Sequence, residues 1–270
     1  MLEQLFRKKG LTENKNTQLK RCLSAFDLTL LGVGCIIGTG IFVLTGIVAA
    51  THSGPAIIIS FIIAGTACAF AALSYAELSS SIGGCGSAYG YSYVAFGELF
   101  AWIIGWILLL EYGVAIAAVA SGWSGYFNNA LVAINIGLPE YLINPPSAGG
   151  VINLPASIII ILIMMLLIAG VKESVKLNTI MVFIKISAIL IFIFIALFNI
   201  NPTNWTPFMP FGWFDRLPDG ETIGLFAGAS IVFFAYVGFD AVSTAAEEAI
   251  NPQKDLPKGI LYSLIICTIF

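Results

Sequence analysis

Residues 32–40 read GVGCIIGTG and place four glycines in nine positions, inside an apolar run that extends from about residue 28 to 50. Each glycine in a helix interior costs up to about 1 kcal/mol relative to alanine, so a helix over this run is weakened near its middle. The cluster is compatible with a dinucleotide-binding turn, a close helix-packing face or a point where a membrane helix unwinds. A dinucleotide fold would need the spacing G-x-G-x-x-G and an acidic residue near positions 52–60, and the sequence has neither.

The two remaining interpretations of the cluster differ in which glycines matter. Gly34 and Gly38 form a GxxxG pair, which is typical of closely packed membrane helices. Gly38, Thr39 and Gly40 lie near the middle of the apolar run, where an unwound backbone would form a binding site at mid-membrane depth. This position favours the unwound point, and helix packing stays open as the alternative.

The composition of the chain is that of an integral membrane protein. Of the 270 residues, 59% are hydrophobic and only 10% are charged, against roughly 25% charged in soluble proteins. The mean hydropathy of +0.95 agrees. A net charge of −3 without a basic patch argues against nucleic-acid binding. Five cysteines, an odd number with no CxxC pair, argue against a disulfide scaffold.

Apolar stretches of about twenty residues, the length that crosses a bilayer, recur along the whole chain. Runs such as 158–168 show none of the alternation that a β-barrel strand would need, so the expected fold class is an all-α membrane bundle. The first run is too long for a cleaved signal peptide, and a second span follows it directly. The expected helices lie near 28–50, 55–79, 98–127, 152–170, 174–199 and 222–245, with a seventh beginning near 257.

Lysine and arginine residues predict the orientation of these helices. Six of the twelve precede the first span, so the positive-inside rule puts the N-terminus in the cytoplasm. Alternation then puts the loops at 128–151 and 200–221 outside, and they carry a single basic residue, Arg216. The cytoplasmic flanks carry four more basic residues, Lys172, Lys176, Lys254 and Lys258. Charges that were not used to set the orientation therefore agree with it.

The last apolar run reaches Phe270 without a polar end and is short for a complete crossing. We therefore expect about six complete transmembrane helices and the start of a seventh, as in a truncated form of a longer protein. The expected divisions are a cytoplasmic segment, 1–27; transmembrane helices 1–5, 28–199; an extracellular loop, 200–221; and helix 6 with an incomplete helix 7, 222–270.

The sixth span contains a second candidate interruption. Residues 233–240 read FFAYVGFD, which places Gly238 among aromatic residues and puts the carboxylate of Asp240 within the apolar run. One glycine alone is a weak signal. Interrupted first and sixth spans, separated by four intact ones, are nevertheless what an inverted five-plus-five repeat would produce.

Four motifs together carry a family resemblance. They are GVGCIIGTGIFVLTG at 32–46, GGCGSAYGYSYVAFGELFAWIIGWILLLEY at 83–112, SGWSGYF at 121–127 and FFAYVGFDAVSTAAEEAINPQKDLPKGI at 233–260. In this order they resemble the amino acid–polyamine–organocation permeases, and most closely the branch of cationic amino acid transporters. The resemblance covers the chain from about residue 20 to 270. Cys35 and Ile107 depart from the alanine and aspartate expected in relatives.

The resemblance implies a leucine-transporter-type fold with inverted repeats, and it implies a substrate site at the two breaks. Backbone N–H groups of Thr39 and Gly40 would hold the substrate carboxylate at the positive end of a half-helix. Gly38 is also implied to belong to the substrate site. Carbonyl groups would face the substrate ammonium, and they belong to Ile36, Ile37, Phe234, Ala235 and Val237. Phe234 is also implied to close the site from outside.

Lys185 is the one basic residue that falls near the middle of an expected span. It lies about eleven residues, or about 16 Å, from the cytoplasmic end, whereas a lysine side chain reaches about 6 Å, so snorkelling does not bring it to water. An ionisable residue at that depth indicates function, and burial disfavours the charged amine. The resemblance places Lys185 where sodium-coupled relatives bind sodium, so we expect proton coupling. A static lysine that only ties helices together is the alternative.

The other polar residues are less informative. Glu111, in the third span, is compatible with lining the pathway or bonding a neighbouring helix, and His52 is expected to be exposed at the outer end of the first span. With one histidine and no cluster of metal ligands, neither a metal site nor a cofactor is expected, and the chain is not expected to be an enzyme. Solvated or structural roles are expected for Glu77, Glu98, Glu247 and Glu248.

The leading interpretation is a multi-pass plasma-membrane transporter that carries L-amino acids by alternating access, in proton-coupled symport. The alternative is a non-transporting remnant or interaction subunit of such a permease. The expected partners are an amino acid substrate, the proton as coupling ion and the lipid bilayer; an accessory membrane protein is left open. Cationic, small neutral and branched substrates all stay open, because the side-chain pocket depends partly on later spans.

Overall fold

The computed structural model describes residues 6–10, 21–82, 86–169, 171–218 and 220–270, and these residues are mostly helical. Two of the basic residues before the first span, Lys15 and Lys20, and residues 83–85 of the second motif lie outside the described part. The chain divides into two compact units, one of residues 1–105 and 178–270 and one of residues 106–177. The all-α fold class is thereby confirmed.

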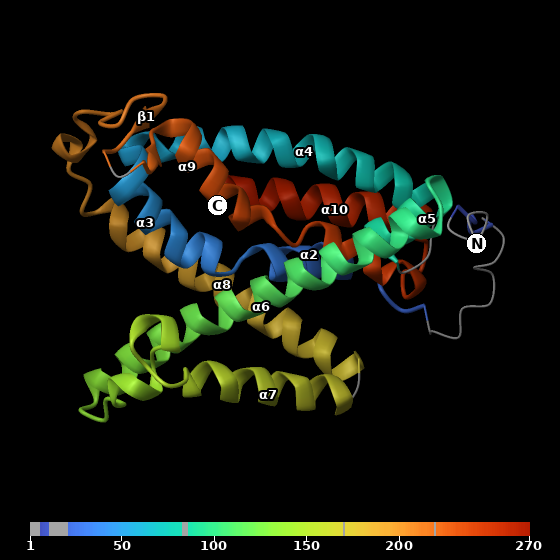
Figure 1. Cartoon of the computed structure of the whole chain (residues 1–270), viewed down its shortest axis with the longest axis horizontal. Helices are drawn as coiled ribbons and strands as arrows, with labels where there is room; N and C mark the ends of the chain where they lie inside the picture. The colour runs from blue at the N-terminus through green and yellow to red at the C-terminus, as the bar shows by residue number, and fades with distance from the viewer. Residues whose placement is uncertain (1–5, 11–20, 83–85, 170, 219) are drawn as a thin grey trace. The chain divides into compact units, whose positions relative to one another are not determined.

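Four helical runs in the described part are long and apolar enough to cross a membrane. They are Gly40–Ser81, Glu98–Ala133, Lys176–Leu197 and Leu225–Glu247. Two shorter apolar helices, Ala25–Ile36 and Leu154–Ile168, correspond to the first part of the first expected span and to the fourth. The run Gly40–Ser81 contains the second part of the first expected span and the whole of the second, because a turn at Gly54, with φ of 61°, separates α3 (Thr45–Val48) from α4 (Ile57–Ser81) (Figure 1).

The first span, helix 1, consists of several pieces. It begins with α2 (Ala25–Ile36) and continues after a break as a π-helical turn (Gly40–Leu44), α3 (Thr45–Val48) and a second π-helical turn (Ala49–Ser53). The helix starts three residues before the expected position, because Ser24 and Asp27 form a capping box that satisfies the first backbone N–H groups. A 3₁₀ turn (Gly54–Ala56) then leads into α4 (Ile57–Ser81).

The expected loop at 80–97 contains a helix that the sequence pattern does not predict, α5 (Ser87–Ala95). Gly97, with φ of 100°, separates α5 from α6 (Glu98–Ala133). At about 1.5 Å per residue, the 36 residues of α6 are longer than a bilayer core requires. The first part of α6, up to Gly105, belongs to the first unit.

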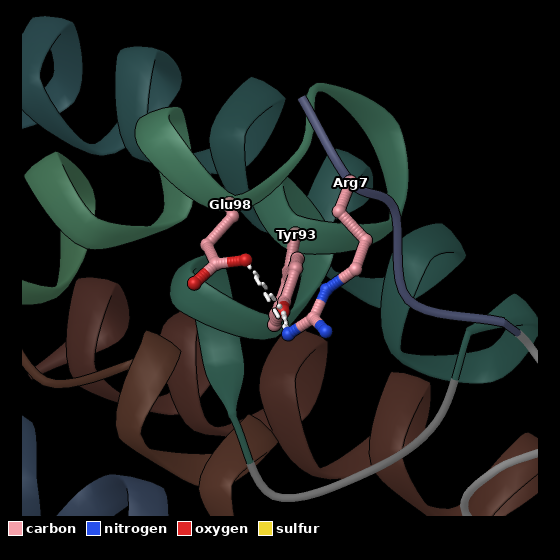
Figure 2. A network of polar contacts seen from close by, with 3 residues as sticks. All are labelled: Arg7, Tyr93 and Glu98. Carbon is pink, nitrogen blue, oxygen red and sulfur yellow. Dashed lines mark hydrogen bonds and ion pairs between the residues drawn. The ribbon is translucent and has the colours of Figure 1, made fainter. Parts of the chain in front are cut away.

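A described piece of the N-terminal segment, residues 6–10, packs on the α5–α6 connection. The carbonyl of Arg7 accepts a hydrogen bond from the backbone N–H of Glu98 at 3.0 Å, which caps the start of α6. Figure 2 shows the side chains of Arg7, Tyr93 and Glu98 converging. The Arg7 guanidinium donates to the Tyr93 hydroxyl at 3.2 Å and lies 3.4 Å from the Glu98 carboxylate.

The second unit contains the rest of α6, α7 (Leu154–Ala169) and the first residues of α8 (Val171–Leu197). Two 3₁₀ turns, Glu140–Leu142 and Pro146–Ala148, lie in the connection between α6 and α7. The start of α7 is tied to α6, because the Ser124 hydroxyl donates to Asn153 Oδ1 at 2.6 Å and the same oxygen accepts from the N–H of Ala156.

After α8 the chain forms a 3₁₀ turn (Pro202–Trp205) and a small antiparallel hairpin, β1 (Asp215–Arg216) with β2 (Thr222–Ile223), which the sequence does not predict. The sixth span, helix 6, follows. It comprises α9 (Leu225–Val232), a 3₁₀ turn (Phe233–Tyr236) and, after a break, a longer 3₁₀ segment (Asp240–Glu247). The last helix is α10 (Pro252–Ile269).

The core of the first unit forms where α10 packs against both α2 and α4 (Figure 1). Its centre is apolar, and Leu28, Leu256 and Ile260 are fully buried there. Glycine allows the helices to approach closely, since a Cβ added at Gly32 would lie 2.5 Å from Ser263 Oγ. Small residues at such crossings are usual in membrane bundles. Helix packing is therefore one role of the glycine cluster.

Candidate functional site

Helix 1 is broken at the position that the glycine cluster predicts. The N–H of Ile37 makes the last hydrogen bond of α2, to Val33, and Ile37 itself is extended, with φ of −73° and ψ of 96°. The carbonyl of Gly38 then accepts from the N–H groups of Ile41 and Phe42, both at 3.1 Å, which starts the next helical piece. The last carbonyl groups of α2 and the first N–H groups after the break lack partners within their own helices.

Helix 6 is broken as well, within residues 233–240. The 3₁₀ turn ends at Val237, whose ψ of 128° is extended, and Gly238 has φ of 122°. That backbone conformation favours glycine, because an L side chain there is strained. After the break, helix 6 continues as a 3₁₀ segment rather than as an α-helix.

The two breaks lie directly against each other, although they are far apart in the sequence. A Cβ added at Gly40 would overlap the Cα of Ala235, and one added at Gly238 would lie 2.9 Å from the Cβ of Cys35. Both glycines therefore provide contacts between the backbones of helix 1 and helix 6. The structure brings together the two sets of residues that the sequence singles out.

The expected site residues differ in how far they are buried. Those at the closest approach of the two helices are buried, and those around the break are partly exposed. The buried ones are Ile36, Ile37, Gly40 and Ala235; the partly exposed ones are Gly38, Thr39, Phe234 and Val237.

The hydroxyl of Thr39 is buried and has no hydrogen-bond partner among the described residues. Buried hydroxyl groups in proteins nearly always have a partner. An orphan hydroxyl beside the first N–H groups after the break is a polar group that a ligand could satisfy.

Lys185 contacts the break directly. Its Nζ donates to the carbonyl of Ile37 at 2.7 Å and to the carbonyl of Gly34 at 2.9 Å. These carbonyl groups belong to the last turn of α2, where the partial charge of the helix is negative, so the ammonium caps that end. The carbonyl of Ile37, which the family resemblance assigns to the substrate ammonium, accepts a hydrogen bond from Lys185 in this structure.

Lys185 belongs to a face of α8 that packs on Gly34. Asn178, Val182 and Lys185 are spaced as neighbours on one side of a helix. A Cβ added at Gly34 would lie 2.5 Å from Asn178 Oδ1 and 3.0 Å from a methyl group of Val182. Sequence reasoning missed Asn178 and Val182, and their helical spacing from Lys185 is the signal that could have found them.

Glu111 lies on α6 in the second unit and its side chain is exposed. It does not belong to the unit that holds the two breaks. Glu98 pairs with Arg7 near the start of α6, in agreement with a structural role.

The expectation that His52 is exposed is wrong, because its side chain is buried. The connection between α8 and α9 covers it: the N–H of Gly224 donates to the carbonyl of His52 at 3.0 Å. The imidazole lies 2.6 Å from the Thr51 hydroxyl and 3.4 Å from the carboxylate of Glu221. The reason is tertiary, since the partner residues come from the end of a loop that is remote in the sequence.

A helical membrane protein whose first and sixth spans break against each other has the architecture of a secondary transporter with discontinuous helices. The chain belongs to the amino acid permease family, whose profile it matches over residues 23–270.

Several curated relatives are similar over nearly the whole chain. A methylthioribose transporter of Bacillus subtilis (strain 168) is 54% identical over 99% of this chain and 58% of its own length. A branched-chain amino acid permease of the same organism is 52% identical over 98% of the chain and 57% of its own length. A vacuolar cationic amino acid transporter of Arabidopsis thaliana is 40% identical over 93% of the chain and 42% of its own length. The chain therefore spans a little over half of the two bacterial relatives and less than half of the plant protein.

Proposed function

We propose that the protein transports L-amino acids across the membrane by alternating access, with the substrate held at the crossing of the two helix breaks. The contact of Gly40 with Ala235 carries this proposal, because it puts the free backbone groups of helix 1 next to those of helix 6. Relatives that are named as permeases and transporters support it and do not favour a non-transporting remnant.

In this proposal backbone groups recognise the two charges that every α-amino acid carries. The N–H groups of Thr39 and Gly40, at the positive end of the outer half of helix 1, bind the carboxylate. The Thr39 hydroxyl, which has no partner among the described residues, adds a donor. The ammonium faces carbonyl groups at the other side of the breaks, those of Ile36, Ile37, Phe234, Ala235 and Val237. The ring of Phe234 closes the site from outside.

Lys185 gives this site a route to proton coupling. While its amine is charged, it holds the carbonyl of Ile37 and the last turn of α2. Loss of the proton removes the attraction between the ammonium and the negative end of α2, and it leaves a carbonyl for the substrate ammonium. Protonation of Lys185 and the conformation of the break are thereby linked, and the proton is the proposed coupling ion. A pathway role for Glu111 remains a separate proposal.

We also propose that the protein lies in the cell membrane with its N-terminus in the cytoplasm. The proposed division into a first repeat (28–199) and the start of a second (222–270) goes with this orientation. The support is the distribution of lysine and arginine, which are concentrated on the segments expected inside. Names of relatives include a vacuolar protein as well as bacterial ones, so the membrane itself needs a direct localisation measurement.

Uptake of radiolabelled leucine, lysine and methylthioribose into proteoliposomes of the intact protein tests the transported class. We expect saturable leucine or lysine uptake, because the proposed contacts are to the carboxylate and ammonium groups. An excess of alanine amide, which lacks the carboxylate, should compete poorly with either. Methylthioribose is a sugar that carries neither of these charges. If it alone were taken up, the proposed carboxylate and ammonium contacts would be wrong, although the protein would still be a transporter.

The proton role of Lys185 is tested with Lys185→Ala and Lys185→Arg in the same vesicles. An arginine keeps the charge and the donors but does not release its proton. We expect both variants to lose pH-driven accumulation, while Lys185→Arg still exchanges internal for external substrate. Proton-driven accumulation that survives in Lys185→Arg would show that this residue does not carry the proton, and the static tie would then be the better account.

A further inference from the structure

Tyr236 is the last residue of the 3₁₀ turn that leads into the helix 6 break, and its side chain is buried. Its hydroxyl donates to the carbonyl of Phe61 in α4 at 3.1 Å. The two rings also contact edge to face, with centroids 6.2 Å apart. Tyr236 thus connects an irregular segment to a regular helix of 25 residues.

Gly65 makes this hydrogen bond sterically possible. It follows Phe61 by four residues, so its own N–H bonds the same carbonyl along the helix, and a side chain at this position would cover that carbonyl. A Cβ added at Gly65 would lie 2.8 Å from the Tyr236 hydroxyl and 3.2 Å from the ring carbon that bears it. A methyl group of Thr268 in α10 lies 3.4 Å from the same point and limits the space on the other side.

The neighbours of Tyr236 in the chain form the closest contact between the breaks. Ala235 packs on Gly40, and the N–H of Val237 donates to the carbonyl of Phe234 at 3.3 Å. An irregular backbone with few internal hydrogen bonds needs outside contacts to keep one conformation. Within the 3₁₀ turn Phe233–Tyr236, the Tyr236 hydroxyl provides such a contact through its hydrogen bond to α4.

We propose that Tyr236 is a positioning residue for the substrate site, and that Gly65 is its required counterpart. The phenol fixes the place of the carbonyl groups of Phe234, Ala235 and Val237 through the hydrogen bond to Phe61. This role rests on the proposed transport function, since it concerns groups that are proposed to bind the substrate ammonium. Neither residue contacts the substrate in this account.

A double-mutant cycle in the intact protein tests the pair. Tyr236→Phe keeps the ring and removes the hydroxyl, and we expect the half-saturation concentration for uptake to rise about threefold to tenfold, as for loss of one hydrogen bond. The maximal rate should stay within about twofold, because the anchor affects binding geometry. Gly65→Ala alone should reduce uptake at least about fivefold, because its methyl group displaces the phenol.

The decisive variant combines both changes. With the hydroxyl gone, the methyl group at position 65 meets less obstruction, so Gly65→Ala with Tyr236→Phe should match Tyr236→Phe alone within about twofold. Tyr262→Phe, at an exposed tyrosine of α10, and Gly113→Ala, where an added Cβ meets nothing within 4 Å, are matched controls and should leave uptake unchanged. Additive losses in the double variant, or an unchanged half-saturation concentration in Tyr236→Phe, would overturn the proposal.

A second readout separates this proposal from the transport function. Cys35 is exposed and its Cβ lies next to Gly238 at the break, so its alkylation rate by N-ethylmaleimide in membranes reports on the break without substrate. In a chain whose other cysteines are replaced by alanine, Tyr236→Phe should change that rate at least about threefold and Tyr262→Phe should not. A changed rate without amino acid uptake in the parent protein would refute the transport function alone. An unchanged rate would refute the positioning role.

Discussion

Gly40 has no space for a side chain, because the backbone of Ala235 occupies the position that a Cβ would take. Gly46, six residues later in the same helix, has open space around it. Gly40 is therefore needed for a contact between helices, whereas Gly46 makes no contact that requires a glycine. Gly32 and Gly34 have a third role, since each faces a side chain of a neighbouring helix rather than the break.

Gly40→Ala should abolish uptake and lower the thermal stability of the purified protein, because the added methyl group separates the two breaks. Overpacking of this kind typically costs about 1–3 kcal/mol. Gly46→Ala should be neutral or stabilise by up to about 1 kcal/mol through helix propensity. Melting temperature in detergent and substrate uptake measure both. Equal behaviour of the two variants would mean that the backbone contact at Gly40 is not needed.

For single residues, the sequence predicts positions in the chain better than it predicts contact partners. The depth of Lys185 in its span follows from counting residues, but its bond to the carbonyl of Ile37 depends on how α8 lies against α2. The bond between Tyr236 and Phe61 likewise needs the register of helix 6 on α4. Periodicity within one helix does not contain that information.

Among the elements, the contact of residues 6–10 with the α5–α6 connection depends on main chain more than on side chains. The Arg7 and Glu98 side chains are 69% and 46% exposed, and an exposed ion pair contributes about 0–1 kcal/mol. The carbonyl of Arg7 caps α6, and a Cβ added at Gly97 would lie 3.0 Å from the backbone of Phe6. The glycine is therefore more sensitive to substitution than the arginine.

Two variants test this difference. Arg7→Ala should change the free energy of unfolding by less than about 1 kcal/mol, because the backbone hydrogen bond remains. Gly97→Ala should cost more than about 1 kcal/mol, since φ of 100° strains an alanine and its methyl group meets Phe6. Thermal or denaturant unfolding in detergent compares them. A larger loss in Arg7→Ala would show that the side-chain network in Figure 2 dominates.

Sequence signals differ in strength from one element to the next. Four clustered glycines predict the break in helix 1. A single glycine indicates the break in helix 6, and this signal is informative only together with the break in helix 1. Helix α5 carries few of the usual signals, because its nine residues SAYGYSYVA mix small and aromatic side chains and include a glycine. It forms where Tyr91 is buried and its ring contacts Tyr75 of α4 edge to face.

In the whole molecule, the two compact units do not follow the order of the chain. The first unit joins helix 1 and α4 with helix 6 and α10, and its boundaries fall inside α6 and inside α8. Hydrophobic runs predict where the chain crosses a membrane, which is why the all-α class and most helix positions follow from the sequence. They do not predict which helices pack together, because nearly every face of such a helix is apolar.

The two π-helical turns of helix 1, Gly40–Leu44 and Ala49–Ser53, bear on how related sequences should be aligned. A π turn bonds residues five apart where an α turn bonds residues four apart, so each turn accommodates one surplus residue. A relative that lacks one residue between Gly40 and Ser53 would have an α turn in place of a π turn. A one-residue gap between these positions in an alignment therefore reflects a change from a π turn to an α turn. The helix break before Gly40 and the turn at Gly54 still align with the corresponding residues of the relative.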